Sequence, residues 1–183
     1  MQHYYQDIQG WFSFSQLYSN VVQKFPEGSH FVEVGVWKGT SAAYMGVEII
    51  NSGKKIKFDC IDPFVPVGDE MPEFKITHED LKNTFIENMK PLEGYYNLIT
   101  IGSPECAEAY EDKSVDFVFI DGDHSYDAVV RDIKAWGPKI KPGGILSGHD
   151  YAMPDVKRAC HDVLGLRDWN DPWGCGCWIL EIE

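Results

Sequence analysis

Short apolar runs alternate along the chain with stretches of helical periodicity, and this order limits the fold more than any other feature of the sequence. The runs are rich in β-branched and aromatic residues, as strands are. We expect strands at 30–35, 55–62, 97–102, 115–121, 142–150 and 175–183. The intervening stretches place apolar residues three and four positions apart, which is typical of amphipathic helices. We expect these helices at about 40–51, 78–90, 103–110, 126–136 and 155–164.

Strands that alternate with helices predict an α/β fold of the Rossmann-like, doubly wound type. Its sheet is expected to be mostly parallel, with helices on both faces and with an antiparallel last strand. Leu81, Phe85, Ile86 and Met89 are expected on one side of their helix, and Ser125 is expected to cap the helix that follows it.

Length and charge restrict the classes of protein that remain. The 183 residues fit one domain, 1–183, and the formal net charge of −13 comes from 29 acidic against 16 basic residues. Such a surface repels phosphate backbones and anionic lipids, so we expect neither nucleic acid nor membrane as a partner. The N-terminus lacks the pattern of a signal peptide, and no apolar run is long enough to span a bilayer.

The five cysteines are interpreted as reduced residues of a cytoplasmic protein. Cys60, Cys106 and Cys160 lie within predicted core elements. Cys175 and Cys177 form a single CGC without a second pair, so alternation along a strand is favoured over a zinc site.

Ligands of doubly wound sheets bind beyond the carboxyl ends of the strands, so the residues that follow each strand are the first candidates. EVGVWKGTS (33–41) follows the first strand, and Gly35 and Gly39 bracket a turn before a helix. The dinucleotide pattern G-x-G-x-x-G is missing because Trp37 replaces its second glycine. The turn indicates a nucleoside ligand without a pyrophosphate, or an ordinary strand-to-helix connection.

Two further positions fit a nucleoside ligand. Asp62 follows the second strand, where a carboxylate can accept both ribose hydroxyls; an Asp-Pro turn with Pro63 is the alternative. Ser103 opens the helix after the third strand, where free N–H groups could meet an adenine edge or simply be capped.

Four potential metal ligands follow the fourth and fifth strands. These residues are Asp121, His124, His149 and Asp150. Oxygen ligands suit Mg²⁺, Mn²⁺ or Ca²⁺, and histidine favours Mn²⁺ or Fe²⁺. A lone carboxylate at a strand end is usually only solvated, but the coincidence at two neighbouring strands favours a functional site.

These motifs together resemble the class I S-adenosylmethionine-dependent methyltransferases, and most of all the small-molecule O-methyltransferases that include the catechol and macrolide-sugar enzymes. The resemblance covers roughly residues 28–165. Its most specific part is FVFIDGDHSYDAVVRDIKAW with KPGGILSGHDY, while EVGVWKGTS and IDPF resemble the first and second family motifs.

The resemblance implies a role for each matching residue. Cofactor contacts fall to Glu33, Gly35, Gly39, Thr40, Ser41, Asp62, Ser103 and Asp121. Asp121, His149 and Asp150 match the positions of the metal ligands, for Mg²⁺ or Mn²⁺, and His124 matches the general base, with Asp121 as the second catalytic residue. The chain departs from the family at His149, where an acidic residue is common, and this leaves metal binding and the metal's identity open.

The expected reaction is therefore metal-assisted methyl transfer from S-adenosylmethionine to a hydroxyl of a small molecule, a sugar or a phenol. The alternatives are a metal-independent methyltransferase for another small acceptor, a nucleotide-binding oxidoreductase, which the missing glycine disfavours, and a non-catalytic cofactor-binding module. An Asn/Asp-Pro-Pro-aromatic tetrad, typical of methylation at DNA or amide nitrogen, is absent after the fourth strand.

Two segments could cover the acceptor. The loop 63–80 is long and rich in Pro, Gly and acids, as lids often are. The N-terminal cap, 1–27, holds five aromatic residues before a helix with Leu17, Val21, Val22 and Phe25. Its aromatics could stack on an acceptor, or the helix could pack on the core or on a second subunit of a homo-oligomer.

Overall fold

The structure, a computed structural model, describes residues 1–65, 78–166, 171 and 174–183. Its strands are β1 (His30–Val34), β2 (Lys57–Ile61), β3 (Asn97–Ile99), β4 (Val115–Ile120), β5 (Ile140–Gly148) and β6 (Trp178–Glu181). Its α-helices are α1 (Ser15–Lys24), α2 (Thr40–Ser52), α3 (His78–Met89), α4 (Ser103–Ala107), α5 (Tyr126–Trp136) and α6 (Pro154–Leu164). Short 3₁₀ turns lie at Tyr5–Asp7, Lys90–Leu92 and Gly137–Lys139.

The six strands form one sheet in the order β3-β2-β1-β4-β5-β6. All neighbours pair in parallel except β5 and β6, which are antiparallel. This is the doubly wound arrangement, whose strand order reverses between β1 and β4. The predicted fold class, including the antiparallel last strand, is confirmed.

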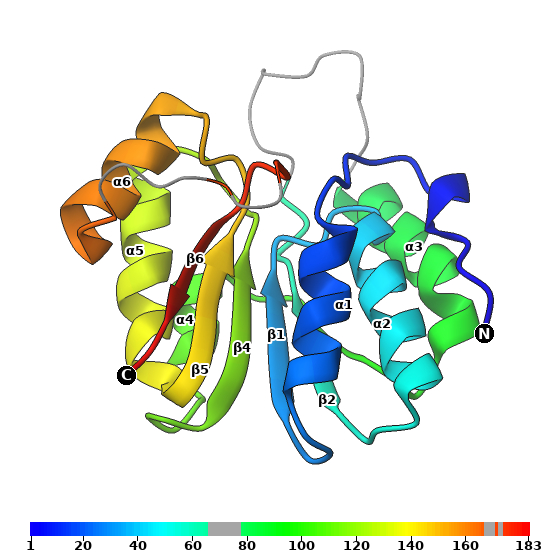
Figure 1. The fold of residues 1–183 in the computed structure, drawn as a ribbon. Coiled ribbons are helices and arrows are strands. Elements are labelled where there is room, and N and C mark those ends of the chain that lie inside the picture. Colours follow the sequence, from blue (N-terminus) through cyan, green and yellow to red (C-terminus); the bar gives the residue numbers. More distant parts are fainter. Residues whose placement is uncertain (66–77, 167–170, 172–173) are drawn as a thin grey trace.

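Helices cover both faces of the sheet, and Figure 1 shows α1, α2 and α3 on one side and α4, α5 and α6 on the other. Side chains of a strand alternate between these faces. Phe31, Phe117 and Phe119 belong to the core under α1 to α3, whereas Val32 and Val118 belong to the core under α4 to α6. The sheet is thus buried on both faces, as a parallel sheet requires.

Strand register brings the carboxyl ends of four strands into one row. Val34 pairs with Ile61 of β2 and Ile120 of β4, and Ile120 pairs with Gly148 of β5. The residues that come next each donate a backbone N–H to a neighbouring strand: Gly35 to Ile61 (2.8 Å), Asp62 to Ile99 (3.1 Å), Asp121 to Val34 (2.8 Å) and His149 to Ile120 (3.1 Å). We call this row, together with the loop residues that directly follow each of its four members, the rim.

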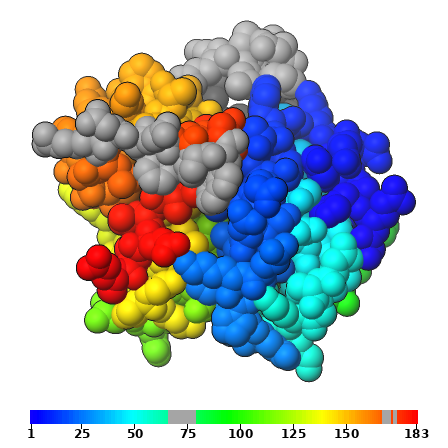
Figure 2. Space-filling model, viewed as in Figure 1, coloured from blue at the N-terminus to red at the C-terminus, as the bar shows by residue number. Residues whose placement is uncertain are grey.

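The N-terminal helix packs on the chain's own core. Leu17, Tyr18, Val21 and Val22 are buried, and Phe25 follows them into the same cluster. Of the five N-terminal aromatics, Phe14 is fully buried and Trp11 is 60% exposed. Figure 2 shows α1 beside the C-terminal segment, where Lys24 and Glu181 form an ion pair of 2.8 Å.

Three local predictions are corrected. Ile86 is 39% exposed while Leu81, Phe85 and Met89 are buried, because a residue five positions after Leu81 lies about 140° around the helix. Cys175 and Cys177 are buried but precede β6, with Gly176 between them at φ +77°, so they do not alternate along a strand. Ser125 occupies the N-cap of α5 without a capping bond from its side chain.

The predicted lid and the predicted absence of a membrane span can be compared with the described residues alone. Most of the predicted lid, 63–80, lies outside them. Among the helices they include, none combines the length and apolarity that crossing a bilayer requires.

Candidate active site

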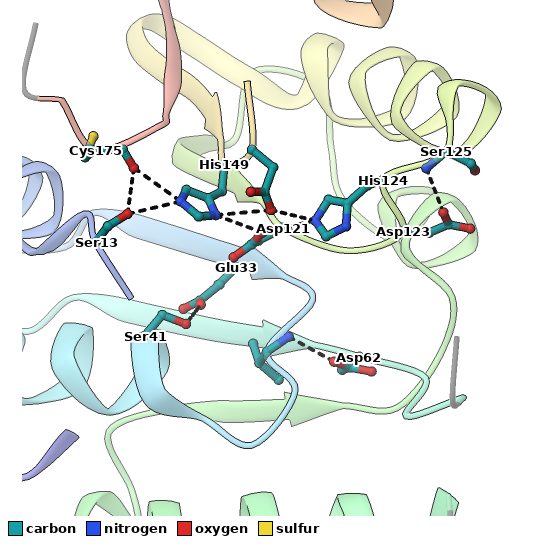
Figure 3. A network of polar contacts seen from close by, with 12 residues as sticks. Ser13, Glu33, Ser41, Asp62, Asp121, Asp123, His124, Ser125, His149 and Cys175 are labelled. Carbon is teal, nitrogen blue, oxygen red and sulfur yellow. Dashed lines mark hydrogen bonds and ion pairs between the residues drawn. The ribbon is translucent and has the colours of Figure 1, made fainter. Parts of the chain in front are cut away.

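Four ionisable side chains meet beyond β4 and β5, as the sequence predicted (Figure 3). Nε2 of His124 lies 3.0 Å from Oδ2 of Asp150 and 3.5 Å from Oδ1 of Asp121. Nδ1 of His149 lies 3.3 Å and 3.7 Å from the same two oxygens. Two carboxylates are therefore enclosed between two imidazole rings.

The carboxylates and the histidines of this cluster shift one another's pKa values. The nearby carboxylates of Asp121 and Asp150 raise the pKa of His124 to about 10. Burial lowers the pKa of His149, but the same two carboxylates outweigh it and raise that pKa to about 10. Both histidines in turn hold the pKa of Asp150 well below its usual range. The two carboxylates thus favour the protonated form of both rings.

The donor set fits a divalent cation. Ligand atoms from Asp121, His124 and Asp150 all lie within 4.8 Å of one another. Carboxylate oxygens with one imidazole nitrogen are a set that suits Mn²⁺ or Mg²⁺. Nε2 of His124 is buried and makes no well-directed hydrogen bond, despite its short distance to Asp150. Such an atom is available to a ligand or to an acceptor hydroxyl.

Backbone conformation and space also mark this place. Asp150 has φ +54°, in the left-handed region that is uncommon for residues other than glycine. A cavity of about 10 Å³ beside His124 and His149 has room for about one water-sized group. A larger hollow of about 470 Å³ lies elsewhere, around His30, Asp59 and Tyr110, away from the rim.

The second edge of the His149 ring is held by two distant segments. Nε2 lies 3.2 Å from Oγ of Ser13 and 3.2 Å from the carbonyl oxygen of Cys175. The ring of Phe14 packs against the imidazole with centroids 4.9 Å apart. Sequence reasoning missed Ser13 and Cys175, because no sequence pattern relates residues that lie 136 and 26 positions from His149.

The loop after β1 is held against β4 and β2. Gly35 has φ +82°, and a Cβ there would overlap the carbonyl oxygen of Asp121. Oδ2 of Asp62 accepts the backbone N–H groups of Val36 and Trp37, both at 2.9 Å. Gly35 therefore lets the backbone of this loop lie close to the Asp121 backbone, directly after β4. Asp62 lies at the rim beside the loop, where it shapes the turn.

Glu33 lies next to this loop on the α1 side of the sheet. Its Oε1 accepts a hydrogen bond from Ser41, so these two predicted cofactor residues are in contact. Burial raises the pKa of Glu33 to about 8. Oε2 of Glu33 and the hydroxyl of Tyr18 are both buried without a directed hydrogen bond. A ligand amino group or a water would satisfy them.

The remaining predicted cofactor residues have protein partners. Gly39, at φ +91°, precedes α2 and packs on Phe85 and Met89. The Thr40 hydroxyl lies 3.2 Å from the carbonyl oxygen of Gln9, so the N-terminal segment crosses the start of α2. Ser103 accepts a hydrogen bond of 2.9 Å from Nε1 of Trp136. Its side chain therefore belongs to the packing of α4 on α5, away from the histidine cluster.

The sequence of the segment from β1 to just beyond β5 matches a known family. A family model described as a methyltransferase domain matches residues 32–151, more than half of the chain. The chain belongs to this methyltransferase family. This match confirms the prediction that the chain is an S-adenosylmethionine-dependent methyltransferase, without identifying the acceptor. No match was found among curated protein sequences.

Solved structures share the fold of this methyltransferase at low identity. The O-methyltransferase NovP superposes with a TM-score of 0.68 and 17% identity, over 93% of this chain and 79% of NovP. A Streptococcus mutans protein assigned as a methyltransferase, in complex with SAH, has a TM-score of 0.61 and 10% identity, over 93% and 97% of the two chains. A protein from Clostridium thermocellum assigned as an rRNA-methylase has 0.61 and 15%, over 94% and 97%. These likenesses show the fold and leave the acceptor open.

Proposed function

We propose that this methyltransferase transfers the methyl group of S-adenosylmethionine to a hydroxyl group of a small molecule, a sugar or a phenol, with a divalent cation and His124 as general base. The observation that carries the proposal is the meeting of Asp121, His124, His149 and Asp150 at the rim. An enzyme that only positions a stronger nucleophile would need neither the imidazole nor the paired carboxylates.

The cofactor would occupy the crevice between β1 and β4, where the strand order reverses. Glu33 and Ser41 would line its methionine part, and the Gly35–Gly39 turn would allow close approach of the backbone. Asp62 would face the ribose hydroxyls; its Oδ2 holds Val36 and Trp37, and its Oδ1, which accepts the Phe64 N–H at 2.6 Å, is the oxygen that would meet them. Thr40 and Ser103 would contact the cofactor through their backbone at the starts of α2 and α4.

The chemistry depends on alignment and proton removal. Methyl transfer needs the acceptor oxygen in line with the sulfur–methyl bond, which is a positioning effect. A cation held by Asp121 and Asp150 would offset the carboxylates that favour the protonated form of His124, and the buried Nε2 of the neutral ring would take the hydroxyl proton. Asp121 and Asp150 would hold the cation and orient the acceptor. A cation bound there would supply Lewis-acid polarisation of the hydroxyl.

Calorimetry with S-adenosylhomocysteine and assays on hydroxylated acceptors with Mg²⁺ or Mn²⁺ test this proposal together. His124→Ala should lower kcat by about 10²- to 10⁴-fold and leave S-adenosylhomocysteine affinity unchanged. Asp62→Ala should weaken that affinity first. Undiminished turnover in His124→Ala would remove the base from the mechanism, and a wild-type protein that binds no S-adenosylhomocysteine would refute the proposal as a whole.

Two observations shape the expected setting. The net charge of −13 favours a small acceptor over nucleic acid, despite the shared fold with an assigned rRNA-methylase. All five cysteines are free and buried, which fits the expected cytoplasmic location.

A further inference from the structure

The hollow of about 470 Å³ opens at the end of the sheet opposite the rim. His30, Lys57 and Asn97, the first residues of β1, β2 and β3, line it together with the segment after α4. Its volume is typical of a pocket for a small molecule. α4 has five residues, about 8 Å of helix, whereas the five residues of β2 extend over about 16 Å. The short helix therefore leaves the amino half of β2 uncovered on its face of the sheet.

The floor of the hollow is the carboxylate of Asp59, whose side chain is 1% exposed. Its Oδ2 accepts hydrogen bonds from Nε2 of His30 at 2.6 Å and from the Tyr110 hydroxyl at 2.7 Å. Its Oδ1 accepts a hydrogen bond from Nδ2 of Asn97 at 2.8 Å, and Nζ of Lys57 lies 3.1 Å from Oδ2. One buried carboxylate thus takes up hydrogen-bond donors from the side chains around it.

These hydrogen bonds decide what the lining side chains can still offer a ligand. A carboxylate can only accept, so Asn97 must present its Nδ2 to Asp59, and its Oδ1 keeps its lone pairs. The Tyr110 hydroxyl donates its hydrogen to Asp59 and likewise keeps its lone pairs. Ser114, which also lines the hollow, donates to the carbonyl oxygen of Glu111 at 2.6 Å. The hollow therefore presents mainly hydrogen-bond acceptors.

Charge and apolar surface favour the same kind of ligand. With the His30 ring neutral, Asp59 and Glu111 contribute two negative charges against the one positive charge of Lys57. The Lys57 side chain is 57% exposed and its charge is already offset by Asp59. A negative hollow in a chain of net charge −13 attracts cations, and so does the face of an aromatic ring. The apolar part of the wall comes from Ile99, Ala109 and the ring of Tyr110.

We propose that this hollow binds a small organic cation, an ammonium or guanidinium group carried on an apolar body. The N–H groups of the ligand would donate to Oδ1 of Asn97 and to the carboxylate of Glu111, and the apolar body would lie against the Tyr110 ring. The site is separate from the rim, so the proposal does not depend on methyl transfer.

Benzylammonium is the probe for this site, and benzyl alcohol and benzoate are neutral and anionic molecules of similar shape. Titrations followed by ¹H–¹⁵N NMR should show saturable shifts of the Asn97 side-chain amide and the Ala109 backbone amide at millimolar benzylammonium. The Gly35 and Asp121 amides at the rim should not shift. Benzyl alcohol should bind about 10-fold more weakly, because it cannot form charge-assisted hydrogen bonds, and benzoate should not bind.

Two variants locate the bound probe. Glu111→Gln should weaken benzylammonium binding by about 10-fold. Glu108→Gln is the matched control, because Glu108 is exposed in the same segment but does not line the hollow. Ala109→Leu should fill part of the hollow and abolish binding. Its denaturant unfolding should match that of wild type, because Ala109 is exposed.

Several results would overturn the proposal. Without saturable shifts at the hollow, benzylammonium has no site there. Benzoate that binds as tightly as benzylammonium would make the hollow an anion site on Lys57. Equal weakening by Glu111→Gln and Glu108→Gln would reduce the effect to diffuse charge attraction. Undiminished binding in Ala109→Leu would place the probe elsewhere on the surface.

Discussion

Glu33 is a carboxyl group with almost no access to solvent, because β1 directs it to the face that α1 and α2 cover. Burial raises its pKa from 4.5 to about 8, despite the hydrogen bond from Ser41. A carboxyl group is usually ionised at neutral pH, as Glu33 is in the unfolded chain. Burial keeps Glu33 protonated in the folded chain, and this lowers the free energy of unfolding.

This burial predicts a pH-dependent stability. The folded state binds one more proton than the unfolded state between pH 4.5 and about 8, so the free energy of unfolding falls as pH rises through this window. Glu33→Gln should remove that slope and be more stable than wild type by about 3 kcal/mol at pH 8. Urea unfolding at several pH values measures this. Parallel curves for the two proteins would contradict it.

Gly35 is the point where the β1 loop lies against β4. Gly35→Ala adds both a strained φ of +82° and an overlap with the Asp121 backbone, so we expect a loss of about 3 kcal/mol or more. Gly53→Ala is the control, because its φ is +71° but its Cβ would meet nothing within 4 Å. It should cost only about 1 kcal/mol. Equal losses in denaturant unfolding would show that the overlap is relieved cheaply.

Asp59 joins separate elements at the other end of the sheet. It is buried in β2 and accepts hydrogen bonds from His30 of β1 (2.6 Å), Asn97 of β3 (2.8 Å) and Tyr110 after α4 (2.7 Å). Burial alone would raise its pKa, but these three donors outweigh burial and hold the pKa well below its usual range. Three strands and the segment after α4 are thus tied to one carboxylate.

Asp59→Asn should therefore destabilise the fold by about 3 kcal/mol at pH 7, because an amide cannot satisfy every donor. A lowered pKa stabilises the fold above the unfolded value of 3.8, and this contribution is lost as pH falls below it. The difference between the two proteins should shrink accordingly in acid. Asp112→Asn, at an exposed pair with Lys139, is the matched control and should cost less than about 1 kcal/mol.

At the scale of the whole molecule, net charge is the property that acts over the longest distance. With a net charge of −13, the chain should not bind tRNA or duplex RNA measurably at about 0.15 M salt. Fluorescence anisotropy with labelled RNA tests this, with S-adenosylhomocysteine present to complete the site. Micromolar binding that weakens with added salt would instead favour an RNA acceptor.

The order of elements, the fold class and the carboxylates at the strand ends could all be predicted from the sequence. Periodicity depends on neighbours three or four residues apart, and parallel strands place their carboxyl ends at one edge whatever the loops do. Asp121, His124, His149 and Asp150 could therefore be grouped before any coordinates were known. Ile86 was misplaced because an apolar residue near a periodic series is easily counted into it.

The partners that hold those side chains required the folded chain. Ser13 and Cys175 meet His149 from opposite ends of the sequence, and Ser103 turns its hydroxyl to Trp136. Such contacts depend on how the helices and terminal segments pack, and local patterns contain no information about packing between distant segments. The chain's short-range order thus specifies which groups reach the rim, and long-range packing specifies how each group is oriented there.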